Sequence, residues 1–271
     1  TYAATLCSFR RFREDKDVTL DDMDSDMMMA YEAYLKNNGV SPNSSSFYMR
    51  NLRAVYNRAV EKGLTSQRFP FKHVYTGVEK TVKRAVPLKV IKRIKEMDFS
   101  MNPSFDFARD MFLMSFYTRG MSFVDMAYLR KKDLQNGVLS YRRRKTGQQL
   151  FIKWEKCMQE IVDKYDTSQS NYLLPIIKPF GDIDERTQYI YAAHNINRCL
   201  KIIGKELGLS VSLTLYVARH AWASIAKSKN VPLSVISEGM GHDSEATTRI
   251  YLASLDTVAI DKANSMILKS L

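Results

Sequence analysis

Hydrophobic positions in the first part of the chain recur at the spacing of α-helices. Apolar side chains lie three and four residues apart between residues 2 and 13, between 20 and 36, and between 42 and 62. This period is typical of helices that bury one face. We therefore expect a small helical domain over residues 1–75.

Polar residues mark the ends of the predicted helices. Thr19 is a predicted N-cap, because acidic residues that suit a first turn follow it. Asn38-Gly39 is a typical C-terminal signal, and Ser41 is the predicted N-cap of the next helix, which ends at Gly63. The sequence thus predicts a break between two helices near Gly39.

A charged stretch with little periodicity, residues 76–86, is predicted to link this domain to a second one over residues 87–271. The second domain begins with an amphipathic helix after Leu88. Residues 105–116 are apolar almost throughout, which predicts a buried helix, and residues 189–207 form another long helix.

One hairpin interrupts the helical pattern. Asn136-Gly137 is a strong turn signal. Residues 138–141 read as a strand and residues 149–154 as its partner, with Lys145-Thr146-Gly147 at the tip between them. We therefore expect a mainly helical fold with a small antiparallel sheet in the second domain.

Composition narrows the class of protein. The chain has 271 residues, of which 45% are hydrophobic, enough for one large or two ordinary domains with real cores. No apolar run approaches the ~20 residues that span a bilayer, and no signal peptide is evident. Three widely spaced cysteines form neither a disulfide framework nor a metal-ligand pattern, which suits the cytoplasm. The first residue is Thr1 rather than Met, so we expect a part of a longer protein.

The formal net charge of +12 favours a polyanion as partner. Arginines repeat along the polar face of the third predicted helix, at Arg50, Arg53 and Arg58. They could contact phosphates, and a solvated helix face is the alternative.

An arginine, a histidine and a tyrosine follow one another in residues 212–252. Arg219 lies in a stretch of helical spacing, His242 follows a predicted turn, and Tyr251 comes nine residues later. A guanidinium can neutralise phosphate oxygens, an imidazole can donate a further hydrogen bond, and a tyrosine hydroxyl can attack phosphorus. The order indicates chemistry on a phosphodiester. The alternative for Tyr251 is a packing role, since the chain has 15 tyrosines.

This segment resembles the active-site region of the tyrosine recombinases, the phage-integrase family, and specifically the integrases of Bacteroides-type mobile elements. The family pattern is His-x-x-Arg, then Leu-Gly-His, then a tyrosine nucleophile nine residues on. The chain has Tyr216-x-x-Arg219, Met240-Gly241-His242 and Tyr251. The resemblance implies catalytic roles for Arg219, His242 and Tyr251. The chain departs from the pattern at Tyr216, whose hydroxyl could still hydrogen-bond a phosphate oxygen.

The family's first catalytic arginine stands in the order Gly-Leu-Arg, three residues before an acid. Here Gly120-Met121 match, Asp125 takes the acidic place, and Ser122 stands where the arginine is expected. Arg119 lies three residues before Ser122, and such positions share a face if the segment is helical. We hypothesise that Arg119 supplies the missing charge. The alternative is a surface arginine and a pocket one charge short.

The resemblance also implies a catalytic lysine on the predicted hairpin, in a Lys-Thr-Gly context that matches Lys145. A lysine on a flexible stem can reach the scissile site and donate a proton to the leaving 5′ oxygen. A basic turn that only contacts phosphate is the alternative.

The implied reaction is a transesterification in which Tyr251 forms a 3′-phosphotyrosyl link and releases a 5′-hydroxyl. Phosphodiester energy is retained, so no cofactor is expected, and the sequence has neither a Walker-type loop nor clustered ligands for a metal. A tyrosine hydroxyl has a pKa of about 10, so its proton needs an acceptor. The family's candidate base is the histidine that Tyr216 replaces, which leaves the base open.

The resemblance implies a site-specific DNA recombinase that integrates mobile DNA. A helical core-binding domain and a catalytic domain would close around double-stranded DNA, and a homotetramer would assemble on two DNA sites. An accessory DNA-bending protein is a further partner that the resemblance allows. An apolar repeat at Leu255, Ala259 and Ala263 predicts a C-terminal helix that packs on its own domain or docks on a neighbour. Two alternatives stay open: a type IB topoisomerase-like enzyme, and a DNA-binding accessory protein that has lost catalysis.

Overall fold

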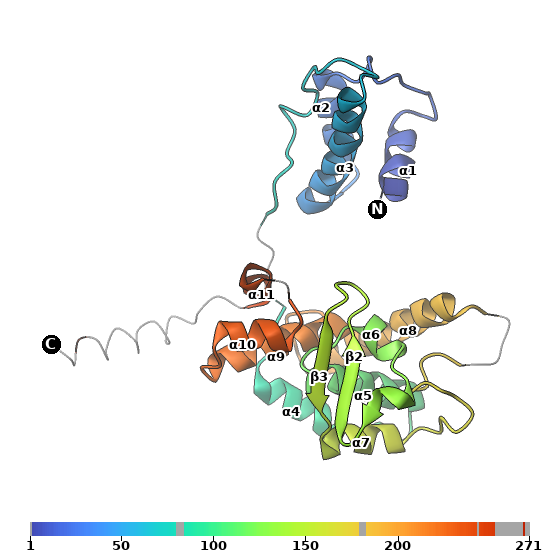
Figure 1. Ribbon diagram of the computed structural model, residues 1–271, viewed down its shortest axis with the longest axis vertical. Helices are drawn as coiled ribbons and strands as arrows, with labels where there is room; N and C mark the ends of the chain where they lie inside the picture. Colours follow the sequence, from blue (N-terminus) through green and yellow to red (C-terminus); the bar gives the residue numbers. More distant parts are fainter. Residues whose placement is uncertain (1, 80–83, 179–182, 243, 253–267, 269–271) are drawn as a thin grey trace. The chain divides into compact units, whose positions relative to one another are not determined.

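The chain divides into two compact units, residues 1–82 and residues 83–271, and each is described by itself. The structure is a computed structural model that describes residues 2–79, 84–178, 183–242, 244–252 and 268 (Figure 1). Most of these residues are helical, and one small sheet lies in the second unit.

Three helices build the first unit: α1 (Tyr2–Phe12), α2 (Ser25–Asn37) and α3 (Pro42–Glu61). They pack around aromatic side chains, of which Tyr31 and Tyr56 have no exposed surface. After α3 the chain returns along the helix, where Phe71 is buried and packs edge-on against Tyr56 with ring centres 6.2 Å apart. The returning segment therefore closes the core of the helical unit.

The helix ends in this unit follow from polar side chains. Ser41 caps α3 as predicted, because its hydroxyl accepts a backbone N–H of the first turn. The prediction of Thr19 as the N-cap of α2 is wrong. Asp24 caps this helix instead, and the hydroxyl of Thr19 donates to the carboxylate of Asp22 in a preceding turn (2.6 Å). A local turn has thus taken up the side chain that was expected to begin the helix.

The helices of the second unit are arranged around α5. They are α4 (Leu88–Glu96), α5 (Pro103–Tyr117), α6 (Phe123–Ala127), α7 (Lys156–Asp163), α8 (Glu185–Glu206), α9 (Leu215–Ser228), α10 (Leu233–Gly239) and α11 (Glu245–Tyr251), with a 3₁₀ turn at Lys131–Asp133. Four successive residues of α5, 111–114, are buried, so this stretch has no polar face. α4, α7, α8 and α9 all pack on α5, which confirms the predicted buried helix.

The sheet consists of β1 (Leu134–Gln135), β2 (Val138–Arg142) and β3 (Gln149–Lys153), antiparallel in the order β1-β2-β3 (Figure 1). Asn136 and Gly137 both have positive φ, 51° and 72°, in the turn before β2. Leu139 pairs with Ile152 and both side chains are buried. The predicted hairpin is therefore confirmed, with residues 143–148 at its tip.

The last three helices form a smaller apolar cluster of their own. Ala223 of α9, Ile236 of α10, Met240 and Leu252 are buried together. The helix predicted after Tyr251 lies outside the described residues. Within the part of the chain that the structure describes, no helix is long and apolar enough to cross a membrane. The mainly helical fold with a small antiparallel sheet is the one that the sequence predicts.

Candidate active site

Arg219 is buried inside the second unit, with 4% of its surface exposed. It lies on α9, and its guanidinium donates to two backbone carbonyls, that of Gly120 (Nη1, 2.6 Å) and that of Met240 (Nη2, 2.8 Å). Nη2 also lies 2.7 Å from Nε2 of His242. Three segments that are far apart in sequence meet at this guanidinium, and the structure brings Arg219 and His242 into contact.

A tight turn at Gly120 permits this approach. Gly120 has a φ of +74°, in the region that favours glycine. A Cβ added here would lie 2.7 Å from the Cα of Arg219. A side chain at this position would therefore push the turn away from α9 and weaken the hydrogen bond to the carbonyl.

His242 is buried and has a partner at each ring nitrogen. Nδ1 lies 2.8 Å from Oγ1 of Thr248, and Nε2 faces Arg219. Burial is the main cause that lowers the pKa of His242 to about 4, and nearby positive charges on Arg219, Arg143 and Lys145 add to it. The imidazole is therefore neutral at pH 7.

The contact with Arg219 also shows which ring nitrogen carries the hydrogen. A guanidinium only donates hydrogen bonds, so Nε2 of His242 accepts. The hydrogen of the neutral ring then lies on Nδ1, which donates to Thr248. In this arrangement Nε2 accepts from Arg219, and the hydrogen bond that the sequence predicts from His242 to phosphate stays a prediction.

Arg143 belongs to this cluster, although the sequence analysis did not single it out. It is 7% exposed, its Nη1 donates to the carbonyl of Gly241, and its Nε lies 3.9 Å from Oδ2 of Asp125. Leu139 and Tyr141 face the core from β2, and Arg143 is the next residue of that inward face. The strand period was therefore the signal that could have found it, and the surrounding run of arginines hid it.

Ser122 and Asp125 hold this arginine in place. The hydroxyl of Ser122 caps α6 and donates to Oδ2 of Asp125 (2.6 Å). Oδ1 of Asp125 accepts the backbone N–H of Arg144 (2.9 Å). Asp125 is 3% exposed, so its carboxylate is a buried partner for Arg143. The serine that stands in place of the family arginine is thus connected, through Asp125, to the hairpin.

Lys145 lies at the exposed tip of the β2–β3 hairpin. The tip is anchored on both sides, because Arg142 donates to the carbonyl of Gly147 (2.6 Å) and the guanidinium of Arg144 lies 3.8 Å from the ring centre of Tyr128. Lys145 is near enough to His242 for its charge to lower the pKa of the imidazole. Its flexible stem is therefore within reach of the cluster.

Arg119 reaches the edge of the cluster by another route than expected. Its φ is +61°, and it lies in the turn between α5 and α6. The helical spacing assumed between Arg119 and Ser122 is therefore wrong. The half-buried side chain passes Gly239, with Cδ 3.7 Å from a Cβ placed there, and its charge acts on Tyr141. A catalytic role for Arg119 stays a prediction.

Tyr216 occupies the place of the family histidine, in the first turn of α9, and is 50% exposed. Its ring packs edge-on against the ring of His220, with centres 4.7 Å apart. His220 is buried.

Tyr251 is the last residue of α11, and its side chain lies outside the described part of the structure. Thr248 lies one turn earlier on the same helix and contacts His242. The helix that carries Tyr251 is therefore attached to the cluster. Among the described residues, no group of three or more His, Cys, Asp or Glu side chains could hold a metal ion.

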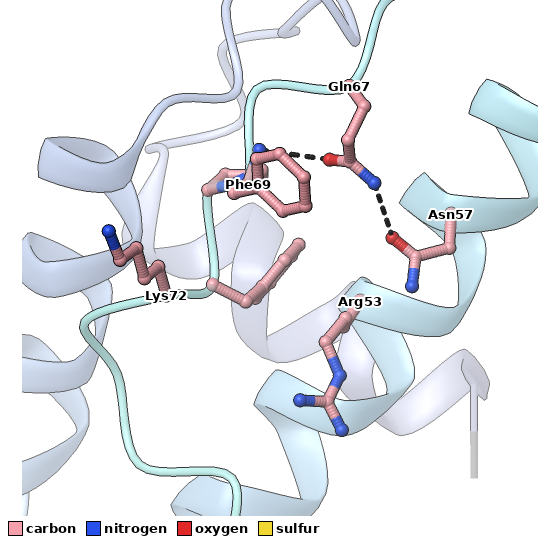
Figure 2. Close-up of a pocket in the computed structure, with 7 residues that line it drawn as sticks. Arg53, Asn57, Gln67, Phe69 and Lys72 are labelled. Carbon is pink, nitrogen blue, oxygen red and sulfur yellow. Dashed lines mark hydrogen bonds between the residues drawn. The ribbon is translucent and has the colours of Figure 1, made fainter.

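A separate hollow of about 240 Å³ lies on the first unit beside α3 (Figure 2). Phe69 stands at its edge, 66% exposed and with a φ of +51°. Its N–H donates to Gln67 Oε1 (2.9 Å), and Gln67 Nε2 donates to Asn57 Oδ1 (3.4 Å). Arg53 and Lys72 add positive charge to the lining. Aromatic, amide and cationic side chains are residue types that contact nucleic acids.

Comparison with known families gives two matches along the chain. The phage integrase SAM-like domain matches residues 1–74, and the phage integrase family matches residues 87–257. A search of curated proteins finds no match.

Three solved structures with a similar fold are each 16% identical to this chain. A lambda integrase dimer bound to a COC′ core site has a TM-score of 0.69, with 92% of this chain and 69% of that chain covered. The Tn1549 transposon integrase in complex with transposon right end DNA has a TM-score of 0.67, with coverage of 96% and 90%. XerH site-specific recombinase bound to a palindromic difH substrate has a TM-score of 0.67, with coverage of 97% and 78%.

At 16% identity these structures show the fold. The family match extends over more than half of the chain and includes every residue of the cluster around Arg219. The chain belongs to the phage integrase family, the tyrosine recombinases, which cleave and rejoin DNA.

Proposed function

We propose that the chain is a catalytically active site-specific recombinase whose nucleophile is Tyr251. The observation that carries the proposal is the buried cluster of Arg219, Arg143 and His242. Among the described residues, this cluster contains two buried guanidiniums and one buried carboxylate, that of Asp125. Burying like charges together is costly unless an anion joins them. The cluster is suited to receive a phosphate, and α11 carries Tyr251 beside it.

Two guanidiniums would bind the scissile phosphate and neutralise the charge of the pentacoordinate transition state. Arg219 is the first. We assign the second role to Arg143, because it is buried beside Gly241 and held by Asp125. It would replace the arginine that is missing at Ser122. Arg119, half-buried at the edge of the cluster, is the alternative.

In the cleavage step the hydroxyl oxygen of Tyr251 forms a bond to phosphorus, and the bond from phosphorus to the 5′ oxygen breaks. His242 would accept the tyrosine proton at Nε2 once Arg219 turns from this nitrogen to the phosphate. The negative charge of a bound phosphate would offset the neighbouring arginines and raise the pKa of the imidazole, which makes it a better base. Tyr216 would then serve only as a hydrogen-bond donor to phosphate.

Lys145 would donate a proton to the leaving 5′ oxygen. The 5′-hydroxyl of a second strand would attack the phosphotyrosyl link and release Tyr251. The hairpin supports this role, because its anchored sides hold Lys145 near His242.

We further propose that residues 1–75 form the core-binding domain, residues 76–86 a linker and residues 87–271 the catalytic domain, and that both domains bind duplex DNA. The net charge of +12 and the basic lining beside Phe69 support this division. On α3, Arg50, Arg53 and Arg58 would contact the backbone, so each would contribute to the salt dependence of binding.

Assembly and source are further parts of the proposal. A solved lambda integrase tetramer is bound to a Holliday junction, and a similar fold in this chain supports a homotetramer on two DNA sites. An integrase of a Bacteroides-type mobile element stays a prediction, and the likeness to a transposon integrase supports the origin in a mobile element. An accessory DNA-bending protein stays a prediction.

A covalent trap tests the central claim. The protein is incubated with DNA that flanks its own gene, quenched in denaturing detergent and examined for protein-linked DNA. We expect an adduct with the wild-type chain and none with Tyr251→Phe, which keeps the ring and loses the nucleophile. Specific binding without an adduct would support an accessory binding protein instead. Relaxation of supercoiled DNA without strand exchange between two sites would support a topoisomerase.

A further inference from the structure

Thr248 has no exposed surface, and its Oγ1 lies 2.8 Å from Nδ1 of His242. The adjacent Thr247 is partly exposed, and its hydroxyl lies 3.2 Å from that of Ser244, the N-cap of α11. Two neighbouring threonines on one short helix thus have different surroundings. Of the two, Thr248 faces the active site.

A neutral imidazole has one donor and one acceptor nitrogen. With Thr248 as the acceptor at Nδ1 and Arg219 as the donor at Nε2, a single arrangement of the ring satisfies both contacts. Without an acceptor at Nδ1, the hydrogen could move to Nε2, where it would face an N–H of Arg219. Arg219 therefore holds Nε2 of His242 as an acceptor, and Thr248 supports the same tautomer because it gives the hydrogen on Nδ1 its partner.

Thr248 also connects His242 to the helix of the nucleophile. Tyr251 follows Thr248 by three residues on α11, a little less than one helical turn. α11 packs on α9, which carries Arg219, and on α10. A movement of α11 that withdraws Tyr251 from the site would therefore withdraw Thr248 from His242 as well.

We propose that Thr248 is a positioning residue that makes the proton-accepting tautomer of His242 depend on the seating of α11. The inference rests on the proposed function, since it deepens the role assigned there to His242. A subunit whose α11 is displaced lacks both the nucleophile and the oriented base. One movement of α11 thus brings both Tyr251 and the oriented base His242 into the site. When α11 is displaced, His242 is not oriented to activate water in place of tyrosine.

The first test needs no DNA. ¹⁵N NMR of protein labelled at histidine distinguishes the ring nitrogen that carries the hydrogen, and His242→Gln identifies the signal among the four histidines of the chain. We expect the hydrogen on Nδ1 in the wild-type chain and in Thr247→Val, and on Nε2 or on both nitrogens in Thr248→Val. A folded Thr248→Val protein that keeps the hydrogen on Nδ1 would overturn the inference.

The second test measures the rate of adduct formation on a nicked duplex made from the DNA that flanks the gene. We expect Thr248→Val to react about tenfold more slowly, as part of the contribution of the base is lost. Thr248→Ser, which restores the hydroxyl, and the matched control Thr247→Val should react near the wild-type rate. A wild-type rate for Thr248→Val would contradict the inference. Absence of an adduct even with the wild-type chain would contradict the proposed function instead, and the NMR result would still decide the tautomer.

Discussion

Two clusters of charged residues, each with buried members, lie in the described part of the second unit, and they differ in their balance. Around Asp110, two carboxylates meet two cations: Arg109 and Lys164 both contact Asp106 and Asp110. The hydroxyl of Tyr165 donates to Asp110 as well (2.8 Å). This network joins α5 to the end of α7, and its charges cancel.

Among the residues that the structure describes, the cluster around Arg219 has more buried cations than buried carboxylates. Arg219 and Arg143 are both buried, Lys145 and Arg119 lie nearby, and Asp125 is the buried carboxylate that the described residues provide. Backbone carbonyls hold the guanidiniums and satisfy donors without cancelling charge. The comparison teaches that a balanced network stabilises the fold, whereas an excess of one sign prepares a site for a ligand of the other sign.

The largest effect is expected from removing the central cation of the unbalanced cluster. Arg219→Gln should lower the rate of adduct formation by about 10³-fold, because one of two groups that stabilise the phosphate charge is lost. The melting temperature should stay unchanged or rise, since the cluster then buries less like charge. Adduct kinetics and thermal unfolding measure the two quantities. A large fall in melting temperature would show that Arg219 holds the fold together and would remove the contrast.

The balanced cluster should respond in the opposite way. Asp110→Ala removes the buried carboxylate and leaves Arg109 and Lys164 with Asp106 alone, and we expect a loss of about 1–3 kcal/mol in the free energy of unfolding. Adduct formation by the folded fraction should stay near the wild-type rate. Denaturant titration gives the stability, and the chain's two tryptophans, Trp154 and Trp222, both report on the second unit. Asp163→Ala at the end of α7 is a matched control and should cost much less.

Local sequence patterns predicted much of the fold, but they did not reveal every buried charge of the cluster around Arg219. Hydrophobic period and turn residues predicted the helices and the hairpin, because burial and caps such as Ser41 act locally. Spacing singled out Arg219 and His242, which the structure brings into contact. Arg143 was missed because charge in a run of arginines suggests a surface, although the strand alternation from Leu139 placed it inside.

The sequence did not predict the turn before α6, because this turn depends on contacts with residues far away in the chain. Arg119 and Gly120 both adopt positive φ, so a segment that was assumed to be helical is a turn packed on α9. The close approach of Gly120 to Arg219 depends on a partner 99 residues away. Likewise, the contact that orients His242 depends on the packing of α11, which no local pattern reveals.

Three arginines of the chain provide a sharper test of which cation completes the site. Arg143→Gln should lower adduct formation by about 10²-fold, because it removes a buried cation beside Gly241. Arg198→Gln is the control, since Arg198 is an exposed arginine on α8. It should change the rate little. A rate that falls about 10²-fold in Arg119→Gln but stays near the wild-type rate in Arg143→Gln would contradict this assignment. Arg119 would then be the second arginine that binds the phosphate.

The smallest effect concerns pH and again depends on the excess of positive charge. In the folded chain burial and the nearby cations lower the pKa of His242 to about 4, whereas an unfolded histidine titrates near 6.5. As pH falls below about 6.5, the unfolded chain therefore binds a proton that the folded chain does not, and the free energy of unfolding decreases until about pH 4. Above pH 6.5 this contribution is fully present.

His242→Gln should lose less stability than the wild-type chain between pH 7.5 and pH 5, as measured by denaturant titration of tryptophan fluorescence at each pH. His73→Gln, at an exposed histidine of the other unit, should follow the wild-type curve. Identical pH dependence in all three proteins would mean that His242 titrates normally, and that the cations around it are not close enough to act as one unbalanced cluster.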